Sequence, residues 1–176
     1  PTQVRRTVLE TAARTAGKDA PALFDRLLAA AIGTKDRNER DDLFNALGSF
    51  RDPALARRAM DLTLDPRIQA RDGARIIGVA FKRPATRPVA LAWLAENYDA
   101  LAARVPRAQQ SYFAAWAGGI CGSDERAQFV ALFATRVADL DAGARTYRQT
   151  LEKIDACIAM RRVQEPALNA FLATAR

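Results

Sequence analysis

The residues of this chain that could do chemistry are few, and histidine is not among them. The sequence contains no histidine at all. A Ser–His or Cys–His nucleophile pair, an H-E-x-x-H zinc motif and an imidazole base are therefore excluded from this chain. We expect it to supply no catalytic residue and no metal ligand.

A glycine-rich stretch, GGICG at residues 118–122, is the loop that most resembles a chemical site. Glycine-rich backbone can cradle a phosphate, and Cys121 could be a nucleophile. No predicted strand precedes the stretch, and no histidine can activate the thiol, so a turn between helices is expected. Because Cys121 and Cys157 are too few for a disulfide scaffold, we expect two semi-buried thiols, with a disulfide as the alternative.

Two acidic groups could in principle bind a metal or transfer protons. They are Glu39, Asp41 and Asp42, and further along the chain Asp124 and Glu125. Each group falls in the first turn of a predicted helix, where the helix dipole favours negative charge. The spacing therefore indicates helix capping rather than metal binding or acid–base chemistry.

Aromatic and basic residues offer two further candidates for binding. Tyr112, Phe113 and Trp116 could form a ligand platform, but core packing is the commoner fate of aromatic side chains at this spacing. Arg83 and Arg87 flank the break before a predicted helix, and connecting segments often carry binding residues. We expect Arg83 and Arg87 to form a functional basic loop, the candidate contact residues of this chain.

The charge of the chain is strongly basic, with a net charge of +7 from 27 Lys and Arg against 20 Asp and Glu. A basic protein invites a nucleic-acid interpretation, which needs a patch of charge with aromatics interleaved. The arginines are instead scattered in pairs such as Arg5-Arg6, Arg57-Arg58 and Arg161-Arg162. Solvated helix faces are the expected explanation, and a nucleic-acid binder is kept as an alternative.

The elements that carry these residues are all predicted to be helices. Apolar residues recur at helical spacing along the whole chain, and no segment alternates with a period of two. Asp52-Pro53, Asp65-Pro66 and Glu165-Pro166 each predict a helix start, because an acidic cap before a first-turn proline is typical of one. About ten helices with short connections indicate an all-α fold, a HEAT- or armadillo-like α-solenoid of antiparallel pairs.

Length and composition predict a single helical domain over residues 1–176. The chain is 49% hydrophobic and 27% charged, which is ordinary for a cored domain. No window approaches the roughly 20 apolar residues of a membrane span, and the N-terminus lacks the order of a signal peptide. Because the chain begins with Pro1, we expect a fragment or a processed product, cytoplasmic in origin, with an exported parent left open.

Residues 46–172 resemble a known family, whereas residues 1–45 resemble it only as generic leading helices. The similarity lies in the order of the segments ALGSFRDPALARRAMDLTLD, QARDGARIIGVAF, LAWLAENYDAL and ARTYRQTLEKIDACIAMRR. Trp93-Leu94 followed by Asn97-Tyr98 and the RQTLEKID stretch also match in spacing. Together they resemble the C-terminal helical domain of zinc aminopeptidases of the alanyl, puromycin-sensitive and endoplasmic-reticulum type.

This resemblance implies a non-catalytic role for the chain. In such enzymes the catalytic zinc and its ligands lie in an upstream domain, so the resemblance implies zinc in the parent and no cofactor in this chain. The C-terminal domain would close over the active-site cavity and limit access to peptides with free N-termini. Its partners would then be the parent's own catalytic domain and peptide substrates, with no nucleic acid and no membrane span.

Two other functions remain open at this point. A stand-alone α-solenoid could bind a protein partner on its concave face. A HEAT-like nucleic-acid binder is supported only by the net charge and the arginines, and its affinity would fall steeply with salt.

Overall fold

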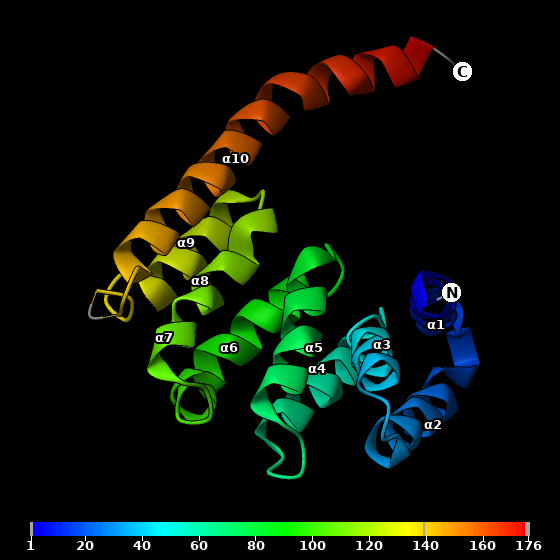
Figure 1. Ribbon diagram of the computed structural model, residues 1–176. Coiled ribbons are helices and arrows are strands. Elements are labelled where there is room, and N and C mark those ends of the chain that lie inside the picture. Colours follow the sequence, from blue (N-terminus) through cyan, green and yellow to red (C-terminus); the bar gives the residue numbers. More distant parts are fainter. Residues whose placement is uncertain (1, 139, 175–176) are drawn as a thin grey trace. The chain divides into compact units, whose positions relative to one another are not determined.

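All regular elements of the structure, a computed structural model that describes residues 2–138 and 140–174, are helical (Figure 1). The prediction of an all-α fold is therefore confirmed. The chain divides into two compact units, residues 1–106 and residues 107–176. The single domain over residues 1–176 stays a prediction, and each unit is described by itself.

The first unit is a stack of helices joined by short connections. Its α-helices are α1 (Thr2–Thr15), α2 (Ala20–Gly33), α3 (Arg37–Leu47), α4 (Pro53–Asp61), α5 (Ala70–Lys82) and α6 (Arg87–Ala102), and its 3-10 turns are η1 (Gly17–Asp19) and η2 (Leu62–Leu64). Helix α3 packs against α1, α2 and α5, and α6 packs against α4 and α5 (Figure 1). Each helix thus packs on helices that are close to it in sequence, as in a helical stack.

The core of the first unit is closed by large side chains and by one close helix approach. Trp93 is fully buried, and its indole nitrogen donates a hydrogen bond to Asp61 over 2.7 Å. Gly48 follows the end of α3 and lies close to α5. A Cβ atom on residue 48 would lie 2.8 Å from the backbone oxygen of Ile76. Glycine is required there because any larger residue would push the two helices apart.

The two Asp-Pro steps have different outcomes. Asp52 caps α4, since its carboxylate accepts a hydrogen bond from the Leu55 amide over 2.9 Å and Pro53 opens the helix, as predicted. The prediction of a helix start at Asp65-Pro66 is wrong, because α5 begins only at Ala70. Asp65 instead binds the backbone amide and guanidinium of Arg67, which lowers the pKa of Asp65 from 3.8 to about 2.

Two buried carboxylates of α3 contradict the expectation that the acidic residues of this segment cap a helix. Asp36 is the residue that caps α3, and Glu39 lies in its first turn. Asp41 and Asp42 lie further along and are buried, so the capping prediction is wrong for this pair. Their arginine partners come from distant segments, which sequence spacing does not reveal. The pairs are Asp42 with Arg5 and Arg6, both at 2.9 Å, and Asp41 with Arg75 at 2.7 Å.

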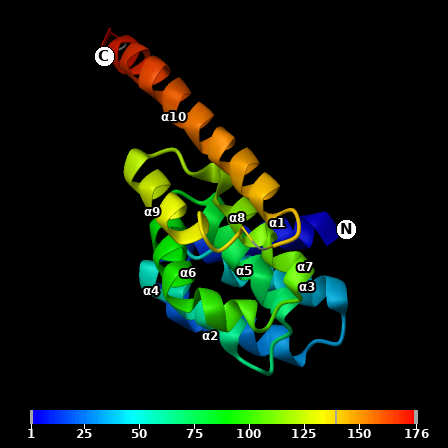
Figure 2. The same cartoon turned by 90° about the vertical axis from the view of Figure 1, so that its left-hand side faces the viewer.

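The second unit is built around one long helix. It contains α7 (Arg107–Gln110), α8 (Tyr112–Trp116), the 3-10 turn η3 (Ala117–Gly119), α9 (Ser123–Phe133) and α10 (Gly143–Thr174). The first half of α10 packs against α8, η3 and α9 through Thr150 and Ile154, which are buried. Beyond this contact α10 continues away from α8 and α9 (Figures 1 and 2).

Two predictions from the sequence concern residues of the second unit. The predicted helix start at Glu165-Pro166 is wrong, since α10 runs through Pro166 without a break. The aromatic residues behave mostly as predicted: Phe113 is buried and stacks on Trp116 with ring centroids 4.9 Å apart. Tyr112 is exposed and takes no part in that core.

The close approach at Gly48 predicts a specific loss of stability. Gly48→Ala should lower the free energy of unfolding of the first unit by about 1–3 kcal/mol, because the added methyl group meets backbone that cannot rotate away. Urea unfolding followed by Trp93 fluorescence in a Trp116→Phe background measures this effect. Gly33→Ala is the control, as no atom lies within 4 Å of a Cβ there and the change should be neutral or stabilising. Equal stability of Gly48→Ala and the parent chain would contradict the packing argument.

Candidate functional site

The two predicted contact residues lie at the junction of α5 and α6. Arg83 directly follows α5, and Arg87 is the first residue of α6. The structure therefore places both near one turn, as the sequence indicates, but it gives them different surroundings.

Arg83 lies in a basic cluster formed by Arg14, Arg51 and Arg83. Its Nη2 atom donates to Ser49 Oγ over 3.0 Å and to Glu10 Oε2 over 3.2 Å, and 21% of its side chain stays exposed. Burial and then repulsion by Arg14 and Arg51 lower the pKa of Arg83. Arg14 and Arg51 add positive charge beside Arg83 that the single carboxylate of Glu10 does not balance, so an added anion would be attracted there.

Arg87 links the start of α6 to the end of α5 through a hydrogen bond. It is 9% exposed, and its Nε atom donates a hydrogen bond to the backbone oxygen of Phe81 over 2.9 Å. Beside it the Thr86 hydroxyl donates to the backbone oxygen of Ala80 over 2.9 Å. These bonds satisfy carbonyl groups at the end of α5 that have no partner within the helix. Of the two predicted contacts, Arg83 has the more exposed side chain.

Sequence reasoning missed a third arginine that holds the chain together. The guanidinium of Arg104 donates to three backbone oxygens in η2 and in the connection between η2 and α5. They belong to Thr63 at 2.6 Å, Asp65 at 2.8 Å and Ile68 at 2.7 Å. An arginine fork can satisfy several carbonyl groups at once, so Arg104 fixes this connection in place of a capped helix start.

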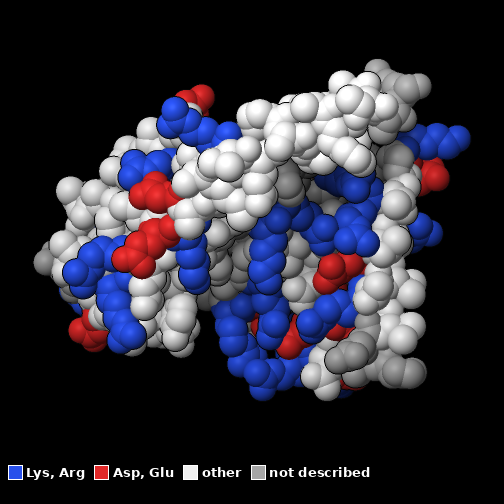
Figure 3. Space-filling view, turned by 90° about the horizontal axis from the view of Figure 1, so that it is seen from above, with Lys and Arg blue, Asp and Glu red and all other residues white. Residues whose placement is uncertain are grey.

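Several of the surface arginines pair with acidic side chains. Lys and Arg side chains spread over much of the face in Figure 3, with Asp and Glu among them. Arg58 bonds Asp25 over 2.7 Å, and Arg57 bonds Glu96. This arrangement agrees with the expectation of solvated helix faces and not with a bare basic patch.

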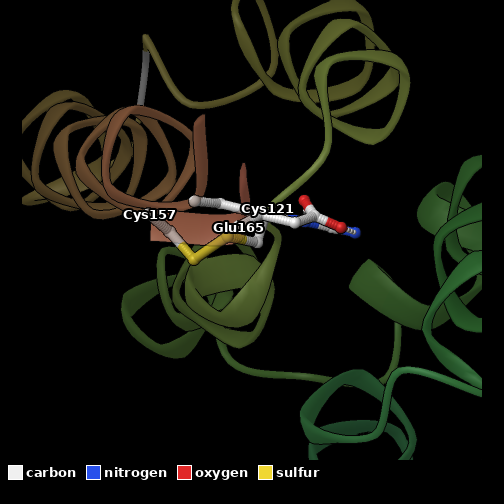
Figure 4. Close-up of a disulfide and its surroundings, with 4 residues drawn as sticks. Cys121, Cys157 and Glu165 are labelled. Atoms are coloured by element: carbon white, nitrogen blue, oxygen red, sulfur yellow. Dashed lines mark hydrogen bonds and ion pairs between the residues drawn. A yellow bond between two sulfur atoms is a disulfide. The ribbon is translucent and has the colours of Figure 1, made fainter. Parts of the chain in front are cut away.

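The glycine-rich stretch is a turn, and it carries a disulfide. It lies between η3, which ends at Gly119, and α9, which begins at Ser123. Cys121 in this turn is bonded to Cys157 on α10 (Figure 4), so the expectation of two thiols is wrong. The two residues are 36 apart in sequence but face each other because α10 folds back over η3. With two cysteines the sequence allows only this pairing, but it does not show that the two residues meet.

A pocket of about 330 Å³ lies beside the disulfide on α10. It is lined by Cys121, Cys157, Met160, Arg161, Gln164, Glu165 and Leu168. Arg161 and Glu165 form an ion pair one helical turn apart at 2.8 Å, which lowers the pKa of Glu165. The pocket lining thus combines the disulfide and apolar side chains with one charged pair.

Metal chemistry finds no support in the described part of this chain. Among residues 2–138 and 140–174, no three His, Cys, Asp or Glu side chains gather as metal ligands would. The acidic residues Asp124 and Glu125 lie in the first turn of α9, as predicted, whereas the N-cap position is Gly122 and no side chain caps the helix by a hydrogen bond.

The disulfide predicts a local loss of stability on removal. Cys121→Ser with Cys157→Ser should reduce the stability of the second unit by about 3–4 kcal/mol, because a cross-link over 36 residues restricts the unfolded chain. Hydrogen exchange with mass spectrometry should show faster exchange in α8 and the first half of α10. Peptides from residues 1–106 are the internal control, and unchanged exchange in both units would contradict the prediction.

Comparison with known proteins identifies the family. Residues 1–156 match the family described as the ERAP1-like C-terminal domain. No curated protein matches the chain in sequence. The match covers both the leading helices, which the sequence resemblance left generic, and the chain as far as the middle of α10. It agrees with the helical fold described above, and the chain therefore belongs to the family of ERAP1-like C-terminal domains.

Proposed function

We propose that this chain is the non-catalytic C-terminal domain of a zinc-dependent aminopeptidase, where it closes over the active-site cavity. The observation that carries the proposal is the family match over residues 1–156. The composition supports it, since a chain without histidine lacks the usual metal ligand and base of such an enzyme. Its partner would be the parent's own catalytic domain.

The physical contribution of the domain would be confinement. The zinc-activated water of an upstream domain would supply the hydrolytic chemistry. A wall of stacked helices beside that centre would exclude large proteins and admit peptides with free N-termini. The helices suited to this task are those held by buried ion pairs and by the Gly48 approach, because a rigid wall keeps the entrance narrow.

The Arg83 cluster would attract the distal, carboxylate end of a peptide. Arg83 keeps part of its side chain exposed, and Arg14 and Arg51 add positive charge around it. Arginine binds carboxylates through paired hydrogen bonds, which gives direction as well as attraction. Arg87 remains a predicted contact, but its hydrogen bond to Phe81 suits it more to holding the junction on which Arg83 lies.

This role predicts a length-dependent change in the parent enzyme. The triple substitution Arg14→Gln, Arg51→Gln and Arg83→Gln should raise KM for peptides of about ten residues roughly tenfold, the loss of one charged interaction. The KM for dipeptide substrates should not change, because they are too short to reach the cluster. Steady-state kinetics on both substrate classes measures the difference.

A surface arginine outside the cluster gives the matched control. Arg58→Gln removes one exposed charge on α4 and should leave both KM values unchanged. Equal KM values for long peptides in the triple variant and the parent enzyme would contradict the proposed role of the cluster. A parallel rise for dipeptides would show that the substitutions disturb the enzyme rather than the contact.

The disulfide bears on the compartment of the parent. Disulfides persist in oxidising environments and are rare where glutathione keeps thiols reduced. The bond between Cys121 and Cys157 therefore favours an exported parent over the cytoplasmic one expected from composition. Within the described residues, no helix combines the length and the apolar character that crossing a bilayer requires.

The stand-alone scaffold remains the rival function. The exposed apolar end of α10 would favour it, because such a surface is a place for a protein partner. It predicts that the chain acts without an attached catalytic domain. The nucleic-acid alternative gains nothing from the structure, since the ion pairs described above engage many of the arginines.

A further inference from the structure

A pocket of about 110 Å³ lies in the first unit, where α2, α3 and the start of α5 meet. Its buried lining residues are Ala31, Phe44, Ile68 and Asp72, so one carboxylate lies among apolar side chains. Its exposed lining residues are Ile32, Arg67 and Gln69, so solvent reaches the pocket between them. The roles proposed for the arginine cluster and for the disulfide do not involve this pocket.

Asp72 brings an unsatisfied oxygen atom to the pocket. Only 2% of the residue is exposed, yet no residue that the structure describes donates a hydrogen bond to its Oδ1 atom. Arg40 Nε lies 3.3 Å from Oδ2, and Arg71 Nε lies 3.8 Å from Oδ1, which is too far for a hydrogen bond. A buried acceptor without a donor costs free energy, so a donor on a bound molecule would be stabilised there.

The same pocket also offers a hydrogen-bond donor. Arg40 Nε is buried, and across residues 2–138 and 140–174 no atom accepts a hydrogen bond from it. Helix α5 begins at Ala70, and the side chain of its N-cap residue, Gln69, makes no hydrogen bond to the first amides. The N-terminal end of a helix dipole favours negative charge, so an acceptor on a bound molecule would be stabilised beside Arg40.

The charges around the pocket restrict the kind of ligand. A simple cation would be attracted by Asp72 but repelled by Arg40 and Arg71, and a simple anion would be repelled by Asp72. A neutral molecule with both charges satisfies the two sets of groups. Because Arg40 Nε and Asp72 Oδ2 are only 3.3 Å apart, the two charges of the ligand must also lie close together.

The volume of the pocket restricts the size of the ligand. An engineered protein cavity of about 150 Å³ binds benzene, so a pocket of about 110 Å³ holds roughly five non-hydrogen atoms. Glycine is of this size, and alanine adds one methyl group, for which the open side of the pocket has room. Larger zwitterions would extend into solvent.

We propose that this pocket binds a small free α-amino acid such as glycine or alanine. The ammonium group of the ligand donates to Asp72 Oδ1, and its carboxylate accepts from Arg40 Nε at the N-terminal end of α5. In a free amino acid one carbon atom carries both charged groups, whereas a peptide carries them at opposite ends. The pocket therefore selects free amino acids and not peptides.

Free amino acids are also what an aminopeptidase releases, so the pocket would bind the product of the parent enzyme. A bound amino acid would bridge α3 and α5, which carry Arg40 and Asp72. The role as a product site rests on the proposed function, whereas binding to the isolated chain does not. The two can therefore fail separately.

The first test compares ligands that differ in one feature, with the unmodified 176-residue chain followed by ¹H–¹⁵N nuclear magnetic resonance. L-Alanine should bind with a Kd of about 1 mM or lower, which a ligand of this size can reach. Three analogues should each bind at least about tenfold more weakly, because each leaves one group of the pocket unpaired. L-Alaninamide lacks the carboxylate, N-acetyl-L-alanine lacks the ammonium group, and L-alanyl-L-alanine separates the two charges.

The position of the signals that shift provides a second criterion. The largest changes should fall on the backbone amides of Ile68, Ala70 and Asp72, which lie at the pocket. Changes centred on Arg83 would assign the binding to the arginine cluster and overturn the proposal. No binding at about 50 mM L-alanine would also overturn it and leave water as the occupant. An analogue that binds as tightly as L-alanine would contradict recognition of both charges.

The second test changes the pocket. Asp72→Asn removes the charge that holds the ammonium group and should abolish saturable binding, with circular dichroism to check that the variant folds. Arg67→Gln, at the exposed side of the pocket, should raise the Kd about two- to fivefold without loss of folding. Arg37→Gln is the matched control, because Arg37 is exposed on α3 and does not line the pocket. Equal affinity in the Arg67 and Arg37 variants would overturn the proposed site.

Discussion

The stack of helices in the first unit depends on buried carboxylates and the arginines that neutralise them. Asp41, Asp42 and Asp72 are at most 9% exposed, and an unpaired charge in such a position costs several kcal/mol. Their arginine partners lie on other helices of the unit. The ion pairs therefore form only when α1, α3 and α5 lie at the correct distance from one another. The same requirement explains why arginine dominates the basic residues, since its fork can bond several oxygens and keeps its charge when half-buried.

Local pattern predicted the class of fold and many helix ends, because these depend on neighbouring residues. Asp52-Pro53 starts α4 for the reason expected, and the glycines at residues 118–119 end a helical stretch. Pattern failed where a distant group decided the outcome. Asp65-Pro66 opens a turn because Arg104, some forty residues away, binds the carbonyl groups of that connection. Pro166 remains inside α10, although a local rule predicts a boundary there.

The candidate site was likewise predictable from the local sequence only in part. The proline break between α5 and α6 identified Arg83 and Arg87 as residues of one junction. Only the packing of the unit separates them, because it places Arg83 beside Arg14 and Arg51 and turns Arg87 toward the backbone of Phe81. The pairing of Cys121 with Cys157 also depends on how α10 folds back, which two isolated cysteines do not encode.

The central claim of the account is the proposal that this helical chain works beside the catalytic domain of a larger enzyme. The most direct measurement is the size and activity of the native protein, captured from source cells with an antibody against this chain. The account predicts a polypeptide larger than 19.2 kDa that releases N-terminal residues from peptides and loses this activity with a zinc chelator. A native protein of 19.2 kDa without aminopeptidase activity would contradict it.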